Sequence, residues 1–143
     1  MNGSEIRIQC GKHYMSAYLS MPKSGSGPGV VVMQEIFGVN QVMREITDMF
    51  AAQGFVAICP DLFWRIEPGV NITDQTKAEW DKAFSLFGKF NRDTGMQDVA
   101  ATIATLRSES KQLGFTALSI AWSLVLAWLV SFMFYQGARA LGY

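Results

Sequence analysis

Residues 28–40 contain an uninterrupted apolar run that leads directly into polar and ionisable side chains. The run is Val-Val-Val-Met at 30–33, and Gln34 and Glu35 follow it. Such a run is typical of a parallel strand covered on both faces; a buried helix segment has the same pattern, but the short length and flanking glycines favour a strand. Open α/β sheets place their binding crevices at the carboxyl ends of strands. Glu35 is therefore either a site carboxylate or a solvated loop acid.

The neighbouring residues show strand-like and helix-like patterns in turn. Residues 6–10 and 13–19 alternate apolar and polar side chains on both sides of a Gly-Lys pair, which predicts an antiparallel hairpin. Apolar residues recur at helical spacing from Asn40 to Gly54, and a second apolar run fills 55–59. This order of strand, helix and strand predicts a βαβ unit whose two strands end at one edge of the sheet.

Two further helices are predicted after this unit. A capping-box pattern at 76–79, Thr-Lys-Ala-Glu, precedes the first one. The apolar stripes of the two helices, which we expect in the core, are Trp80, Ala83, Phe84 and Phe87, and then Met96, Val99, Ile103 and Leu106. The aperiodic segment 62–71 reads as a loop at the same sheet edge, where Trp64 and Arg65 either line a pocket or cover the core.

Composition limits the functional classes. Half of the 143 residues are hydrophobic, and 12 basic residues balance 12 acidic ones. This composition suits one folded domain and disfavours disorder or a nucleic-acid-binding surface, so we expect a small-molecule partner and no nucleic acid. No metal-ligand cluster and no glycine-rich phosphate loop are visible, which predicts chemistry without a cofactor or metal.

The cysteines and the single histidine do not form a recognisable site. Cys10 and Cys59 lie far apart in strand-like contexts, which predicts reduced core residues rather than a disulfide framework. His13 lies in the predicted hairpin without a neighbouring acid or nucleophile, so we expect a strand residue rather than a catalyst. The chain opens without a long apolar segment, and we therefore expect no secretory signal and a cytoplasmic location.

Four short motifs occur in a fixed order and at fixed separations. They are Gln-Glu-Ile-Phe-Gly-Val-Asn at 34–40, Met-Arg-Glu at 43–45, Gln-Gly-Phe at 53–55 and Cys-Pro-Asp-Leu at 59–62. Through them, residues 28–107 resemble the N-terminal half of the dienelactone hydrolase (carboxymethylenebutenolidase) family of α/β-hydrolases. The resemblance implies one partial α/β-hydrolase domain over 1–143, with an N-terminal antiparallel hairpin and flanking helices. It also implies hydrolysis of small esters or lactones.

The family resemblance assigns roles to two neighbouring residues. It implies a Cys-His-Asp triad that attacks an enol-lactone carbonyl, and a glutamate that helps to generate the thiolate; Glu35 matches this glutamate. A thiol is a poor nucleophile until it is deprotonated, and a carboxylate in a partly dry site can accept its proton. The resemblance also implies one oxyanion-hole amide at Ile36 and a second one directly after the nucleophile.

The family pattern changes after residue 116. Where the family has the nucleophile elbow Gly-Tyr-Cys-Leu-Gly-Gly, residues 117–122 read Ala-Leu-Ser-Ile-Ala-Trp. Ser119 takes the place of the cysteine, and Ile120 would supply the second oxyanion-hole amide. Ser119 is then either the nucleophile or a buried serine without a catalytic role. No histidine, aspartate or glutamate follows residue 109, so the rest of the triad has no match, and we expect the chain to be incomplete for catalysis.

Three interpretations of the C-terminal segment stay open. The preferred one is a reading-frame disturbance over 117–125 followed by early termination, because 126–130 and 140–143 again resemble the family. In the second, the charge-free span 113–135 is a transmembrane helix. In the third, the chain is a catalytically silent α/β module that binds a small acid or a partner, and its unpaired sheet edge promotes self-association.

The resemblance also bears on the substrate. The family holds the substrate carboxylate with arginines, and one of these positions aligns with Trp80. This difference favours an ester or lactone less acidic than a dienelactone. Arg44 and Arg65 are basic residues near the predicted edge, where each is either a substrate ligand or an ordinary surface charge.

Overall fold

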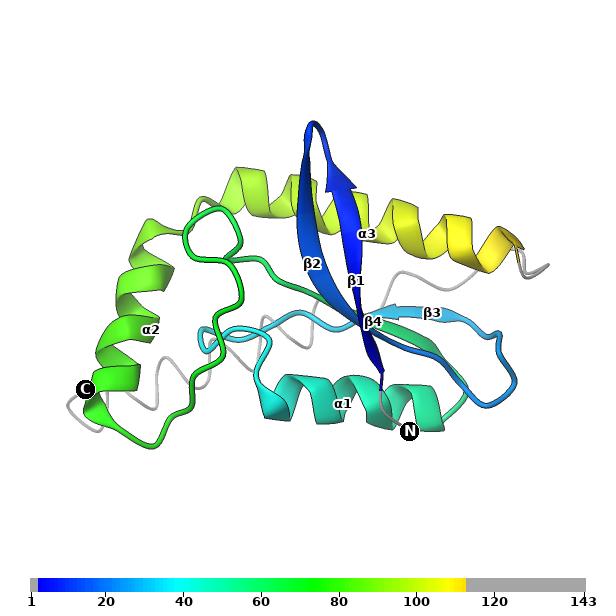
Figure 1. Cartoon of the computed structure of the whole chain (residues 1–143), viewed down its shortest axis with the longest axis horizontal. Helices are drawn as coiled ribbons and strands as arrows, with labels where there is room; N and C mark the ends of the chain where they lie inside the picture. Colours follow the sequence, from blue (N-terminus) through cyan, green and yellow to red (C-terminus); the bar gives the residue numbers. More distant parts are fainter. Residues whose placement is uncertain (1–2, 113–143) are drawn as a thin grey trace.

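The computed structural model describes residues 3–112, with side chains described through residue 108. Its four strands form one mixed sheet in the order β1-β2-β4-β3 (Figure 1). The strands are β1 (Ser4–Cys10), β2 (His13–Ser20), β3 (Gly29–Val31) and β4 (Val56–Pro60). This arrangement confirms the predicted α/β class and its N-terminal antiparallel hairpin. Ser119, Ile120 and the span 113–135 lie outside the described residues.

The predicted βαβ unit is present. β3 and β4 pair in parallel, with Val31 opposite Ile58, and β2 pairs antiparallel with the other side of β4. All five residues of β4 are buried, as expected for a strand covered on both faces. β3 is shorter than the apolar run suggests, because the chain leaves the sheet after the Val32 N–H donates to the Ile58 carbonyl at 2.8 Å.

Helix α1 (Gln41–Ala52) covers one face of the sheet. It begins at the predicted cap, where the Asn40 side-chain oxygen accepts a hydrogen bond from the Met43 N–H at 3.1 Å. Met43 packs on this face with Val32 and Cys59. The predicted spacing of apolar residues therefore gives the correct helix and places Met43, Ile46 and Phe50 toward the sheet. Val42 and Met49 belong to the same pattern but are 56% and 48% exposed.

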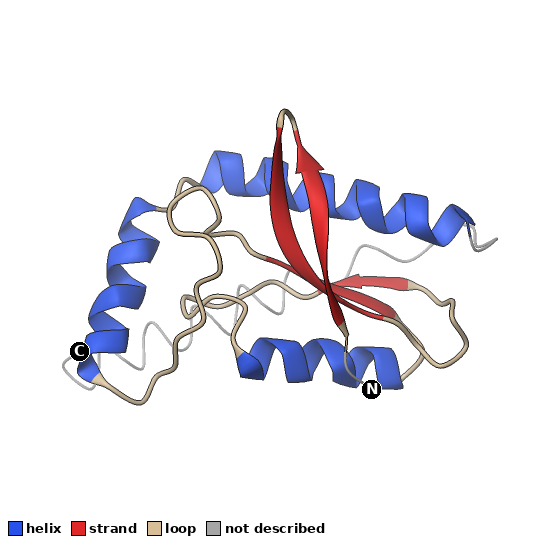
Figure 2. Cartoon of the chain, in the orientation of Figure 1, coloured by secondary structure: helices blue, strands red, loops and turns tan. Residues whose placement is uncertain are grey.

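Helices α2 (Lys77–Lys89) and α3 (Arg92–Gln112) follow as predicted (Figure 2). α3 lies on the opposite side of the sheet from α1, where Val99 and Leu106 pack with Val56 and Ile58 (Figure 1). Thr76 caps α2 by accepting from the Glu79 N–H at 3.2 Å, while the Glu79 carboxylate binds Thr73. The capping box is thus only half formed.

The predicted core stripes contain two errors. Phe87 of α2 is 53% exposed and Met96 of α3 is 51% exposed. On α2 the buried positions are Ala83 and Leu86, and Leu86 packs against Phe63 and Val70 of the preceding loop. The side of α2 that carries Leu86 faces the protein, and this leaves Phe87, one residue further round the helix, toward solvent.

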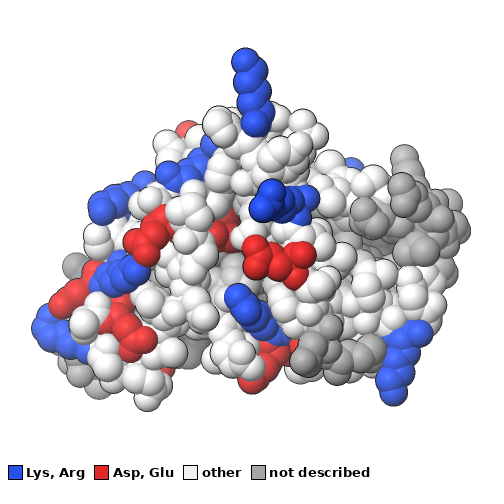
Figure 3. All heavy atoms as spheres, in the orientation of Figure 1, with Lys and Arg blue, Asp and Glu red and all other residues white. Residues whose placement is uncertain are grey.

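The described surface carries charges of both signs. Figure 3 shows basic and acidic side chains interspersed on one face, and Lys82 bonds Glu67 across α2 and the preceding loop at 2.6 Å. Within residues 3–112, no helix is both long and apolar enough to cross a membrane.

Candidate active site

Glu35 lies in a tight loop just beyond the carboxyl end of β3. The loop closes where the Gly38 N–H donates to the Glu35 carbonyl at 3.4 Å. The Glu35 side chain is half-buried, and no donor among the described backbone and the side chains of residues 3–108 is bonded to its carboxylate. The neighbouring Ile36 N–H is likewise without an acceptor in that part of the chain. A carboxylate and a backbone donor are therefore adjacent and available at this edge.

Gln34 joins the ends of the two parallel strands. Its side-chain oxygen accepts a hydrogen bond from the Leu62 N–H at 2.9 Å, and its amide group donates to the Glu35 carbonyl at 3.4 Å. Leu62 follows β4 by two residues. The expectation that both strand ends contribute to one edge is confirmed, and Gln34 is the residue that connects them.

The loop 70–72 fixes the other side of the Glu35 loop. The Ile72 N–H donates to the Phe37 carbonyl at 3.2 Å, and the Asn40 side-chain amide donates to the Ile72 carbonyl at 3.0 Å. Gly38 sits between them with φ of +79°, and a Cβ on it would lie 2.0 Å from the Val70 carbonyl oxygen. This position therefore accepts only glycine without local rearrangement.

Aromatic rings pack between α2 and the loop that carries Glu35. The Trp80 ring contacts Phe37 edge-on with centroids 5.0 Å apart, and Phe84 lies 5.6 Å from Trp80. The Trp80 indole N–H donates to the Asp74 carbonyl at 2.9 Å, which ties α2 to the preceding loop. Trp80, which the family resemblance is expected to place at an arginine position, is thus packed against the loop that carries Glu35.

The surroundings of Glu35 favour its protonated form. Burial raises the pKa of the Glu35 carboxyl, and the negative charge of Asp74 raises this pKa further. Both causes act in the same direction. A carboxylate with a raised pKa is a stronger base than an ordinary surface glutamate, so Glu35 is suited to accept a proton from a neighbouring nucleophile.

Asp61 shapes the loop after β4, a role that the sequence analysis did not assign. Its side chain is buried and accepts hydrogen bonds from the Phe63 N–H at 3.1 Å and the Gly69 N–H at 2.8 Å. Burial raises the pKa of this carboxyl, whereas the two N–H donors lower it. The bond to the Phe63 N–H, two residues on, is an Asx turn, for which an aspartate directly after a strand is a local sequence signal.

Asp98 of α3 binds the side chains of both Trp64 and Arg65. It is 1% exposed, and it accepts from the Trp64 indole N–H at 2.9 Å and from the Arg65 Nε and Nη2 at 3.1 and 2.8 Å. Trp64 also packs against the main core. Of the two alternatives for these residues, covering the core is the one that the structure supports.

The histidine and the cysteines follow their predicted structural roles. His13 is an exposed residue of β2 whose ring lies 6.3 Å from that of Trp64. Both cysteines are free thiols, and burial raises the pKa of Cys59 to about 12. A thiol with this pKa stays protonated at neutral pH, so Cys59 is a core residue rather than a nucleophile.

Comparison with known proteins decides the family. The sequence model of the dienelactone hydrolase family matches residues 15–118. The chain belongs to the dienelactone hydrolase family. The crystal structure of a provisionally named dienelactone hydrolase from Klebsiella pneumoniae superposes with a TM-score of 0.62 and 26% identity, over 74% of this chain and 43% of that one.

Curated relatives support the same assignment. A provisionally named carboxymethylenebutenolidase of Azospirillum brasilense is 61% identical over 79 residues, 54% of this chain and 34% of that protein. The carboxymethylenebutenolidases of Pseudomonas sp. (strain P51) and Pseudomonas putida are 40% and 35% identical, over 65% and 92% of this chain and 39% and 56% of theirs. The chain therefore spans between about a third and somewhat over half the length of these relatives.

Proposed function

We propose that this chain carries a hydrolase site for small esters or lactones, built from Glu35, Ile36, Ser119 and Ile120. Glu35 is the proton acceptor, and the Ile36 N–H is a donor to the oxyanion. The observation that carries the proposal is the half-buried Glu35 carboxylate next to the Ile36 N–H, neither of which has a hydrogen-bond partner in the part of the chain that the structure describes. Membership in the dienelactone hydrolase family supports these roles.

The proposed reaction proceeds through an acyl-enzyme. The Glu35 carboxylate takes the proton of the nucleophile, for which Ser119 stands in the family position, and the serine oxygen attacks the ester carbonyl. Negative charge develops on the carbonyl oxygen, where the Ile36 and Ile120 N–H groups donate hydrogen bonds. The leaving alcohol departs with a proton from Glu35, and water then hydrolyses the acyl-serine.

The substrate is proposed to be an uncharged ester or lactone. Phe37, Trp80 and Phe84 form an apolar group of rings beside the Glu35 loop, and Asp74 adds negative charge near Glu35. An anionic acyl group would meet this negative charge, whereas a neutral aryl or alkyl group would pack on the rings. The proposed reaction is therefore ester hydrolysis, as in the family, but the preferred substrate is uncharged, unlike a dienelactone.

Hydrolysis of a neutral aryl ester tests the proposal. We expect p-nitrophenyl acetate hydrolysis by the purified chain to fall about a hundredfold or more in both Glu35→Gln and Ser119→Ala, since each change removes a catalytic group. Glu45→Gln removes an exposed carboxylate of α1 and is the matched control. Activity that survives both site changes, or activity in none of the proteins, contradicts the proposal.

A catalytically silent binding module is the second candidate. Within the described residues, β3 is the last strand of the sheet, so its outer side has no partner strand there. Such an edge pairs readily with another strand, which supports self-association. Size-exclusion chromatography coupled to light scattering distinguishes this candidate, because a monodisperse monomer without esterase activity fits neither function.

A further inference from the structure

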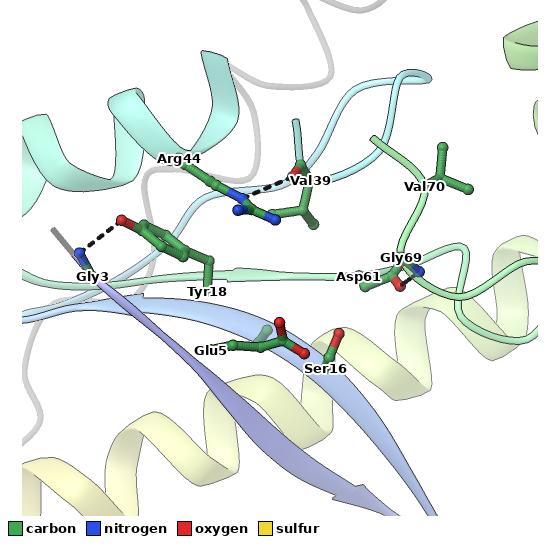
Figure 4. Close-up of a pocket in the computed structure, with 10 residues that line it drawn as sticks. Gly3, Glu5, Ser16, Tyr18, Val39, Arg44, Asp61, Gly69 and Val70 are labelled. Carbon is green, nitrogen blue, oxygen red and sulfur yellow. Dashed lines mark hydrogen bonds between the residues drawn. The ribbon is translucent and has the colours of Figure 1, made fainter. Parts of the chain in front are cut away.

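A polar hollow of about 250 Å³ lies on the α1 side of the hairpin, and Glu35 is not among the residues that line it. Strands β1 and β2, helix α1 and the loop after β4 form its walls (Figure 4). Its polar lining includes Glu5, Ser16, Tyr18, Arg44 and Asp61. The volume lies just below the range of about 300–1,000 Å³ typical of ligand pockets, so it suits a compact ligand.

Arg44 supplies unused hydrogen-bond donors to this hollow. Its Nε donates to the Val39 carbonyl at 3.2 Å, and its guanidinium carbon lies 5.6 Å from the centre of the Tyr18 ring. Among the side chains that the structure describes, those of residues 3–108, no carboxylate forms an ion pair with Arg44. An arginine has five N–H donors in a planar fork that matches a carboxylate, and four of them remain here for a ligand.

Two carboxylates define the opposite side of the hollow. Figure 4 shows Glu5 and Ser16 with their polar atoms facing the space below Arg44, and Asp61 at its end. Asp61 is held by the Phe63 and Gly69 N–H groups, which leaves one lone pair on each of its oxygens. The negative charge of Glu5 is felt at Asp61, so the two acids form one negative end.

We propose that this hollow binds a small zwitterion of the α-amino-acid type, with its carboxylate on Arg44 and its ammonium group toward Glu5 and Asp61. The proposal is independent of the hydrolase function. A simple anion would be attracted to Arg44 but repelled by the carboxylates of Glu5 and Asp61. A simple cation would be attracted to these carboxylates but repelled by the Arg44 guanidinium. A ligand with both charges can bind Arg44 with its carboxylate and the two acids with its ammonium group. The Tyr18 ring forms an apolar wall beside it.

Calorimetric titration of the full chain with glycine, acetate and methylammonium tests this inference. We expect glycine to bind saturably, and acetate and methylammonium to bind at least about tenfold more weakly, because each makes only one of the two charged contacts. Arg44→Gln and Glu5→Gln should each weaken glycine binding about tenfold or more. Arg92→Gln, which removes an exposed arginine of α3, should leave glycine binding unchanged.

The Arg44 and Glu5 variants test the two charged contacts separately. Glu5 is exposed on β1, so Glu5→Gln keeps the fold even if Arg44→Gln disturbs α1, and circular dichroism checks both. Absence of glycine binding by the parent chain overturns the inference. Acetate binding as tight as glycine binding, or glycine binding that survives Glu5→Gln, also overturns it.

Discussion

The ring of Trp80 meets the ring of Phe37 edge-on, with 5.0 Å between the ring centroids. Trp80 belongs to α2, and Phe37 lies two residues after Glu35 in the loop that leaves β3. The contact therefore holds a surface helix against the loop that carries the proposed proton acceptor. We therefore expect both the stability of the protein and the position of Glu35 to depend on this pair of rings.

Replacement of Trp80 tests this dependence. We expect Trp80→Leu to lower the free energy of unfolding by about 1–3 kcal/mol, because it removes an aromatic contact and the hydrogen bond to the Asp74 carbonyl. Phe87→Leu on the exposed side of the same helix should change it by less than about 0.5 kcal/mol. Urea unfolding measures both, and equal losses in the two variants would show that the Phe37 contact contributes nothing.

Gly38→Ala should be much more costly than Gly69→Ala. Both glycines have positive φ, +79° and +74°, so alanine brings a backbone penalty of about 1–2 kcal/mol at either position. At Gly38 the new methyl group also meets the Val70 carbonyl, whereas at Gly69 no atom lies within 4 Å. Thermal unfolding of the two variants checks the difference, and a Gly38→Ala protein as stable as Gly69→Ala would contradict the described approach of the loops.

Asp98→Asn should destabilise the protein by about 2–3 kcal/mol. Breaking a buried ion pair costs about 3–5 kcal/mol, and the 38% exposure of the Arg65 side chain reduces this penalty. The exposed pair of Lys77 and Asp81 gives the control, because Asp81→Asn should cost less than about 0.5 kcal/mol. Chemical denaturation of both variants is the measurement, and a cost at Asp98 no larger than that at Asp81 refutes the expectation.

Glu35→Gln should stabilise the protein at neutral pH. A carboxyl whose pKa is higher in the folded than in the unfolded protein costs stability once it is ionised, so stability falls as the pH rises through these two values. The glutamine variant lacks this cost. We expect its melting temperature to exceed that of the parent at pH 7. This difference in melting temperature should disappear below about pH 4, where Glu35 of the parent is protonated in both the folded and the unfolded protein.

Calorimetry across this pH range measures how the difference in melting temperature between the variant and the parent changes with pH. Glu45→Gln is the control for loss of an exposed carboxylate. A gap that widens toward acid would mean that the pKa of Glu35 is lowered rather than raised. Asp74→Asn supplies a second check, because removal of its charge should lower the Glu35 pKa in an NMR titration.

Local sequence patterns predicted most of the described fold. The cap at Asn40 and the helical period after it placed α1, and the alternation on both sides of Gly11 gave the hairpin, because these signals act over a few residues. The stripes of α2 and α3 identified the helices but misplaced Phe87 and Met96. A helical period shows which residues share a face, and only the neighbouring elements decide which part of that face is covered.

The sequence predicted the site less completely. Glu35 is predicted from its position after a strand and from the family motif, and Ile36 from the family motif alone; like Ser119 and Ile120, both stay predictions as site residues. The contacts of Asp98 with Trp64 and Arg65 were missed, since they join residues more than thirty positions apart and leave no periodic signal. The proximity of Asp74 to Glu35 was missed for the same reason.

The position of β4 between two other strands also determines which part of the sheet unfolds last. Ile58 is paired with Leu19 of β2 on one side and with Val31 of β3 on the other, and neither partner is local in sequence. The tip of the hairpin around Gly11 can fray without disturbing these pairings, whereas β4 loses them only when the sheet as a whole comes apart. Deuterium should therefore enter the amides of β4 last, at the rate of global unfolding.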